Sequence, residues 1–220
     1  MKKQQAGFTL IELAIVLVII GLLLGGVLKG QELINSAKVK NMASDFKNIQ
    51  VYIYGYQDKF RALPGDDKLA DSHLTGGIKA TTNGTTGNGV IEGPYNTITA
   101  TDETALFWQH VRLAGLAAGP TSTADANYYP TNADGGRIGI SSVVSNTAVT
   151  ELPTAGGISG AFIICSEGVL GKFAKQLDTA LDDGNTQTGS VRVVTKGAKS
   201  IGLTNADTLD SNPYAVCMAF

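Results

Sequence analysis

The chain has 220 residues, a formal net charge of −2 and a hydrophobic fraction of 43%. The length allows one domain with an appendage, or two very small domains. The near-neutral charge gives no reason to expect bulk attraction to nucleic acid. Two cysteines and two histidines lie far apart in the sequence, so a zinc site has little support.

The amino terminus combines a short basic segment with a long apolar one. Residues 1–7 read MKKQQAG, and the 21 residues of the run over 8–28 carry a single charge, Glu12. As a helix this run would be roughly 31 Å long, which matches the hydrocarbon core of a bilayer. Lys2 and Lys3 favour an orientation with the amino end in the cytoplasm. We therefore expect a membrane span with the rest of the chain outside.

The position of Gly7 distinguishes this terminus from an ordinary secretory signal. Such signals have a shorter apolar stretch, and a cleavage site of small residues follows it. Here the small residue precedes the run, so cleavage there would leave the apolar helix on the mature protein. A carboxylate at the centre of a membrane costs about 2–3 kcal/mol, and less near the interface. Glu12 therefore has two interpretations: a group at headgroup level without a role, or one that pairs with a positive group inside an assembly.

The segment GFTLIE, from Gly7 to Glu12, resembles the processing motif of type IV prepilins and type II secretion pseudopilins. The resemblance implies cleavage between Gly7 and Phe8 by the prepilin peptidase, followed by N-methylation of Phe8. It also implies that Glu12 guides each subunit into a filament, with the freed amino group of Phe8 on a neighbouring subunit as its partner. The implied partners are other pilins or pseudopilins and the inner-membrane assembly platform. The implied location is the inner membrane, with the head in the periplasm, and then an extracytoplasmic or cell-surface filament.

The apolar pattern changes after Lys29 but does not stop. Apolar residues recur at steps of three and four, which predicts one buried face of a helix. Since the segment LPG over 63–65 marks a stop, we predict one helix over 8–60, with an amphipathic half at 29–60. A two-stranded coiled coil is an alternative, but the roughly 160 residues that follow need a helix to pack against. The stripe consists of Val39, Met42, Phe46, Ile49, Ile53, Tyr56 and Phe60.

Residues 61–220 are expected to form a globular head. A stretch rich in Gly, Asn and Thr over 75–101 predicts turns. A short helix is predicted over 105–114, after an N-cap candidate at 101–103, and another over 170–181 that ends in the turn DDGN. Strands are predicted over 136–144, 161–165, 191–195 and 214–220. The sum is an α+β arrangement, and the resemblance implies the pilin fold, in which the long helix packs against a small antiparallel sheet.

Three parts of the head are also similar to proteins described only as prepilin-type or pseudopilin-like. They are RALPGD over 61–66, the segment over 107–116, and LDDG over 181–184 with TGSVR over 188–192. This similarity extends over most of the chain but implies no known ligand.

Cys165 and Cys217 are the two cysteines of a chain that we expect to be exported. An oxidising compartment favours a disulfide between them. In the chain-entropy model a loop of this size stabilises by roughly 4 kcal/mol. The alternative is a pair of buried free thiols packed as small hydrophobic groups.

Other candidate sites are weaker. Asp66, Asp67, Asn83, Asn88 and Glu92 offer hard oxygens for calcium, and some pseudopilins hold calcium in a loop of this kind. Asn88 and Glu92 fit best, although the segment lacks the full spacing of a calcium loop. We therefore expect no metal or cofactor beyond this weak candidate.

A catalytic role is not indicated. His110 is a lone histidine on a helix, where packing is the usual role, and no serine lies in a G-x-S-x-G elbow. The sequence thus predicts a structural subunit of a pilus-like or pseudopilus-like filament, not an enzyme. The alternatives are an anchored ligand-binding protein, and an adhesive or DNA-binding minor pilin at a filament tip.

Overall fold

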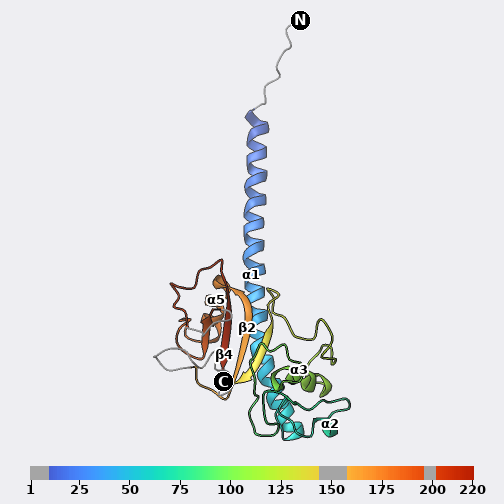
Figure 1. The fold of residues 1–220 in the computed structure, drawn as a ribbon. Coiled ribbons are helices and arrows are strands. Elements are labelled where there is room, and N and C mark those ends of the chain that lie inside the picture. The colour runs from blue at the N-terminus through green and yellow to red at the C-terminus, as the bar shows by residue number, and fades with distance from the viewer. Residues whose placement is uncertain (1–9, 144–157, 196–201) are drawn as a thin grey trace. The chain divides into compact units, whose positions relative to one another are not determined.

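The computed structural model describes residues 10–143, 158–195 and 202–220 (Figure 1). Its longest element is helix α1, Leu10–Phe60. The described residues up to Lys38 form one unit, Val39–Phe220 forms a second, and α1 runs through both. The predicted leader, with Gly7 and Phe8, lies outside the described residues. The predicted end of the helix at Phe60 is confirmed.

The predicted apolar stripe forms the buried face of α1 in the second unit. Phe60, the last stripe residue, is half-buried and packs on the Tyr56 ring at 4.7 Å between ring centroids. Because the head of the same chain covers the stripe, the coiled-coil interpretation is wrong. The fully buried members are Val39, Met42, Phe46, Ile49, Ile53 and Tyr56.

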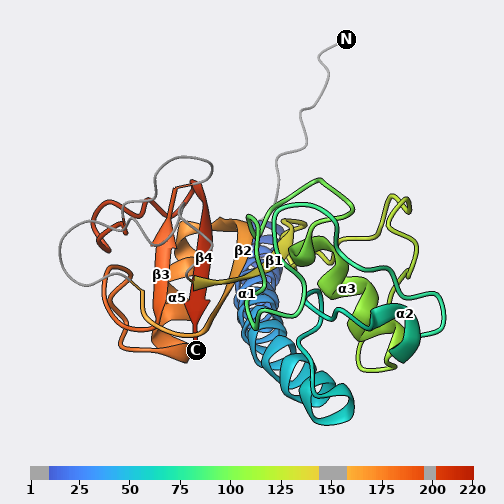
Figure 2. The ribbon, with the colours of Figure 1, turned by 60° about the horizontal axis from the view of Figure 1, so that its bottom comes forward.

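A four-stranded antiparallel sheet forms the centre of the head. Its strands are β1 (Ile138–Ser142), β2 (Phe162–Leu170), β3 (Val191–Val194) and β4 (Pro213–Ala219). The spatial order is β1-β2-β4-β3, so the last strand of the chain lies between β2 and β3 (Figure 2). The alternation of side chains along a strand divides the buried residues between the two faces of the sheet.

One face of the sheet joins the main core with α1. Ile164 and Val216 belong to this core, together with the α1 stripe. Their neighbours Cys165 and Cys217 belong to a smaller cluster on the other face, where Tyr95 also packs. Cys165 and Cys217 are directly opposite each other in the register of β2 and β4, and a disulfide joins them as predicted.

Short helices complete the head. Helix α3, Glu103–Leu113, is buried from Glu103 to Arg112 and contacts β1. Helix α5, Gly171–Leu181, contacts β2, β3 and β4 (Figure 2). Its apolar residues Phe173, Ala174 and Leu177 are buried in the main core, as their helical spacing predicts.

Some predictions of the elements need correction. Strand β2 continues to Leu170, five residues beyond the predicted end, through Ser166, Glu167 and Gly168. The apolar pattern breaks there, but the backbone stays paired, with a register shift that includes Gly168 at a φ of 70°. The four-residue helix α2, Ala70–His73, was not predicted. Strand β1 lies within the predicted range over 136–144, of which Val144 is outside the described residues.

The packing of α1 predicts different effects for two neighbouring truncations. Ile53 is 0% exposed and Val51 is 63% exposed on the same helix. Ile53→Ala should lower the free energy of unfolding by about 2–5 kcal/mol, because it leaves a cavity in the core. Val51→Ala should change it by less than about 0.5 kcal/mol. Urea unfolding of the full chain in detergent measures both values, and similar losses would contradict the packing described above.

Candidate functional site

The amino-terminal part of α1 exposes a continuous apolar surface. All side chains from Leu10 to Lys29 are exposed. Within the described residues, α1 is the one helix long and apolar enough to cross a membrane, judged by length and composition. Such a surface is strongly unfavourable in water, so it needs a bilayer or other apolar helices around it.

Glu12 is the acidic residue of the first described turn of α1. Its neighbours Ile11 and Leu13 are exposed apolar side chains. A carboxylate therefore lies within a surface that is otherwise suited to lipid or to other helices. Gly7 and Phe8, the two other residues of the predicted processing site, are outside the described residues, so the structure does not bring these three together.

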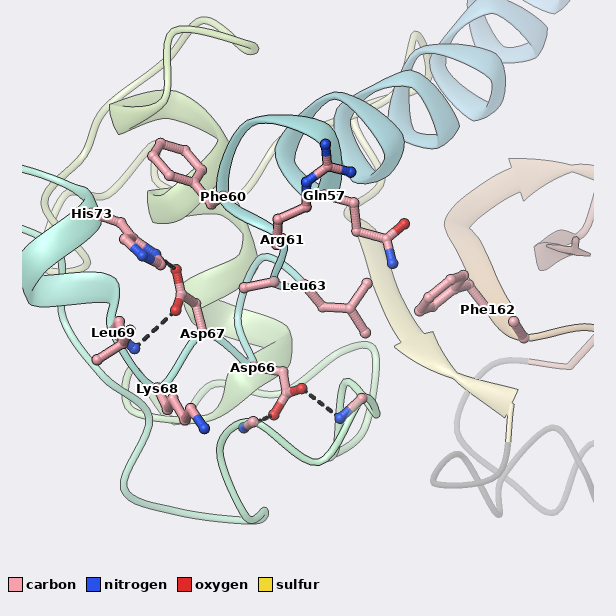
Figure 3. Close-up of a pocket in the computed structure, with 14 residues that line it drawn as sticks. Gln57, Phe60, Arg61, Leu63, Asp66, Asp67, Lys68, Leu69, His73 and Phe162 are labelled. Atoms are coloured by element: carbon pink, nitrogen blue, oxygen red, sulfur yellow. Dashed lines mark hydrogen bonds and ion pairs between the residues drawn. The ribbon is translucent and has the colours of Figure 1, made fainter.

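A second group of polar residues surrounds the end of α1, at the turn Gly65–Asp67, which we call the acidic turn. The Asp67 carboxylate is buried and accepts hydrogen bonds from Tyr56 Oη at 2.8 Å and from the Leu69 N–H at 2.8 Å; His73 Nδ1 lies 2.7 Å from it (Figure 3). Burial alone would raise the pKa of Asp67, but the bonds to His73, Leu69 and Tyr56 outweigh burial and lower it. Asp67 thus fixes the chain as it leaves the helix.

Asp66 points the other way and holds a loop over residues 84–93, which we call the glycine-rich loop (Figure 3). Its carboxylate accepts the backbone N–H groups of Gly87, Asn88 and Gly89. Burial raises the pKa of Asp66, and the nearby Glu92 adds to the rise, while the three N–H groups oppose it. The acidic turn therefore anchors both the helix end and this loop through backbone hydrogen bonds.

Glu103, at the start of α3, lies beneath the same loop. Its side chain is 0% exposed, and Oε2 accepts the Glu92 N–H at 2.7 Å. Oε1 has no hydrogen-bond partner among the described residues. Burial, followed by the charges of Asp66, Glu92 and Asp102, raises the pKa of Glu103 from its usual 4.5 to about 8. Glu103 is therefore largely protonated at neutral pH.

Of the five calcium candidates, the structure places Asn88 and Glu92 together in this loop. Asn88 Nδ2 donates to Glu92 Oε2 at 2.9 Å, and the Thr85 N–H donates to the same oxygen at 2.6 Å. Asn83 Nδ2 donates to Asp102 at 3.0 Å. The side-chain oxygens of Asn88 and Glu92 thus bind N–H groups of the loop itself.

Asp102 was expected near the start of the short helix as part of an N-cap. It occupies the cap position of α3 with extended backbone, but its side chain makes no capping bond. Instead its carboxylate accepts hydrogen bonds from Thr82, Asn83 and Thr97. The residue therefore holds the preceding loop, a role that depends on tertiary contacts and has no signal in the local sequence.

A pocket of about 610 Å³ opens beside the acidic turn (Figure 3). Phe60, Leu63 and Phe162 provide its apolar wall, while Asp66, Asp67, Lys68 and His73 provide its polar groups. None of the lining residues, all within the described ranges, is a serine, threonine or cysteine. Both aspartates of the lining accept hydrogen bonds that hold the helix end and the glycine-rich loop.

His110 also has a structural role. The Gly65 N–H donates to its Nδ1 at 2.9 Å, and Nε2 lies 2.8 Å from the Ile78 carbonyl oxygen. This pattern fits a neutral ring with the proton on Nε2. Burial lowers the pKa of His110, although the bond to Ile78 opposes the change. The residue joins the acidic turn to the chain after α2.

Residues 2–28 match the family model described as the prokaryotic N-terminal methylation motif. No curated protein matches the chain. The match supports a prepilin leader of the type IV pilin and pseudopilin kind, followed by an apolar helix suited to membrane anchoring.

Glu103 predicts a stability difference that depends on pH. Since its pKa is raised in the folded state, the folded protein retains a proton between pH 4.5 and about 8 that the unfolded chain loses, and stability falls as pH rises through this window. Glu103→Gln should therefore raise the free energy of unfolding at pH 8 by at least about 1 kcal/mol. The gain should shrink toward pH 4.

Urea unfolding across this pH range measures the effect, with the exposed Glu32→Gln as the matched control. An equal gain at all pH values would contradict the proposed cause.

Proposed function

We propose that the chain is a structural subunit of an extracytoplasmic filament of the type IV pilus or type II secretion pseudopilus kind. The observation that carries the proposal is the prepilin leader joined to the apolar, exposed part of α1 over 10–28, whose single acid is Glu12, ahead of a folded head. This combination supports the proposal that the chain is first held in a membrane and that its apolar helix is later surrounded by the helices of other copies.

The first step is processing. The prepilin peptidase would cleave between Gly7 and Phe8 and leave residues 8–28 as the membrane and filament-core part of the mature protein. Methylation of the Phe8 amino group would follow. Before assembly, the chain would lie in the inner membrane with residues 61–220 as a head in the periplasm, attached through the amphipathic half over 29–60.

The second step is assembly, which needs opposite charges inside an apolar environment. When helices of several copies pack together, Glu12 of one copy loses its contact with water or headgroups. An unpaired charge there is costly, whereas the amino group of Phe8 on the adjoining copy would neutralise it. Burial of the apolar half of α1 against sister helices would supply most of the cohesion. The charge pair thus selects the register between copies.

A tethered ligand-binding protein is the second candidate, and the pocket beside the acidic turn is the observation that favours it. Its volume of about 610 Å³ suits a small molecule. The two aspartates of its lining, however, already bind Tyr56 Oη and backbone N–H groups. The filament role therefore remains the proposal.

Processing can be tested directly by mass spectrometry of the protein from cells with an active prepilin peptidase. The mature chain should begin at Phe8 and carry one methyl group on its amino terminus. Gly7→Leu should retain the leader, because the small residue before the cut is part of the motif. Gln5→Ala, in the leader but outside the motif, should be processed normally. An intact Met1 terminus on the wild-type protein would overturn the proposal.

Assembly predicts a difference between two acids of α1. Glu12→Gln should reduce the recovery of mature chain in sheared filaments at least about tenfold. Leaving one buried partner unpaired costs about 3–5 kcal/mol, and each 1.4 kcal/mol is a factor of ten. Glu32→Gln, at an exposed site where Lys29 is the partner at 2.6 Å, should assemble normally.

Cells that carry the chain's own assembly system are required, and mass spectrometry should show that both variants are processed. Normal filament recovery with Glu12→Gln would contradict the assembly mechanism.

A further inference from the structure

Three aspartates converge at the carboxyl end of α5, in the turn that leads to β3. Oxygens of Asp178, Asp182 and Asp183 lie within 4.8 Å of one another. Asp178 is buried, Asp182 is half-buried and Asp183 is exposed, so the group extends from the interior to solvent. We call these three residues the aspartate cluster. The helix-and-turn prediction over 170–185 is confirmed, but it gave no reason to connect Asp178 with the other two.

Asp178 is the unusual member. It is 0% exposed, and neither carboxylate oxygen has a hydrogen-bond partner among the described residues. A buried carboxylate without partners is strongly unfavourable. The position of Asp178 adds to the free-energy cost of its negative charge. The negative end of the helix dipole lies at this end of α5, and the last turn of the helix has no basic residue. Another positive group is needed to balance this arrangement.

The two outer aspartates are held in position by the turn. Asp182 Oδ2 accepts the Val191 N–H at 2.9 Å. Asp183 accepts the Asn185 N–H at 2.8 Å and the Thr188 hydroxyl at 2.6 Å. A carboxylate has about four lone-pair positions, so these bonds orient both groups and leave room for a further ligand.

Gly189 shows how closely the turn approaches the cluster. A Cβ at this position would lie 1.8 Å from Asp182 Oδ2, and its φ of 74° also favours glycine. The turn therefore closes over Asp182 only because residue 189 has no side chain.

Arg192 on β3 supplies a positive charge that acts on the cluster. Its charge opposes the rise in the pKa of Asp178 and contributes, after the bonds from Thr188 and Asn185, to the lowered pKa of Asp183. Its guanidinium also donates to the carbonyl oxygens of Gly189, at 3.1 Å, and Gln187. Lys175, on the same helix as Asp178, pairs with Asp210 at 3.0 Å. Three carboxylates and one guanidinium leave an excess of two negative charges, which a divalent cation matches.

We propose that the aspartate cluster binds a calcium ion, which ties the end of α5 to the turn before β3. Calcium binds oxygens at about 2.3–2.6 Å, so two of its ligands are at most about 5 Å apart. The separations within the cluster fit one ion of this size. All three side chains offer hard oxygens and no nitrogen or sulfur, which disfavours zinc and copper. Calcium also accepts the irregular geometry of a turn more readily than magnesium does.

A proton is the competing way to neutralise the cluster. Burial, followed by the charges of Asp183 and Asp182, raises the pKa of Asp178 to about 7, although the charge of Arg192 opposes the rise. A protonated Asp178 would need no ion. The two cases differ in whether stability depends on calcium.

The test is thermal unfolding of the full chain in detergent at pH 7.5, after removal of metals with a chelator, with and without millimolar calcium chloride. The wild-type protein should gain about 5 °C in unfolding temperature with calcium. Asp178→Asn should lose this gain, and without calcium it should be at least as stable as the wild type, because the variant has no buried charge. Asp183→Asn, at the exposed rim, should bind calcium at least about tenfold more weakly by calorimetry.

Two controls locate the site. Asp125→Asn, in an exposed loop elsewhere, should keep the full gain in unfolding temperature with calcium. Glu103→Gln, which changes the buried acid beneath the glycine-rich loop, should keep it as well. The absence of any gain in the wild type would overturn the proposal in favour of the proton. A full gain in both Asp178→Asn and Asp183→Asn would place the ion elsewhere, and an equal gain with magnesium would overturn the choice of calcium.

Discussion

Contact between one face of α1 and the sheet is the interaction on which the head depends. Met42, Phe46 and Ile53 of that face share a core with Ile164 and Val216 of the two central strands. Helix α5 adds to the same core, whereas the disulfide lies on the opposite face of the sheet. Without the α1 face, the part of this sheet surface that α5 does not cover would be exposed to water.

Buried carboxylates organise much of what lies outside this core. Asp66 and Asp67 each accept several hydrogen bonds, which fix a loop and a helix end and oppose the cost of burying the two carboxylates. Glu103 and Asp178 differ, because each has at least one buried oxygen without a partner among the described residues. Burial, followed by the charges of neighbouring acids, raises the pKa values of both. Buried carboxylates in the head therefore have two roles. Asp66 and Asp67 hold backbone segments in place, whereas Glu103 and Asp178 favour the binding of a proton or a cation.

The same helix serves two environments, and its composition changes accordingly. Up to Lys29 its side chains are exposed and mainly apolar, which suits lipid or sister helices. From Val39 onward only one face is apolar, which suits a head on one side and water on the other. One continuous helix can thus supply a membrane anchor, a filament core and a support for the head. The proposed function requires all three roles.

The sequence by itself determined the end of α1 at Phe60, the α+β class, the presence of the four strands and the prepilin-type leader motif. These features depend on periodicity and on short motifs, which are local properties of the chain. The pairing of Cys165 with Cys217 was also predictable, because no other cysteine is available.

Only the tertiary structure decided the strand order β1-β2-β4-β3, the length of β2 and the positions of the buried acids. Asp66 reaches residues more than twenty positions away, and Asp183 joins the i,i+4 pair of Asp178 and Asp182 because the chain turns after α5. Burial and the pKa of a carboxylate depend on what the rest of the chain places around it, and no local pattern contains that information.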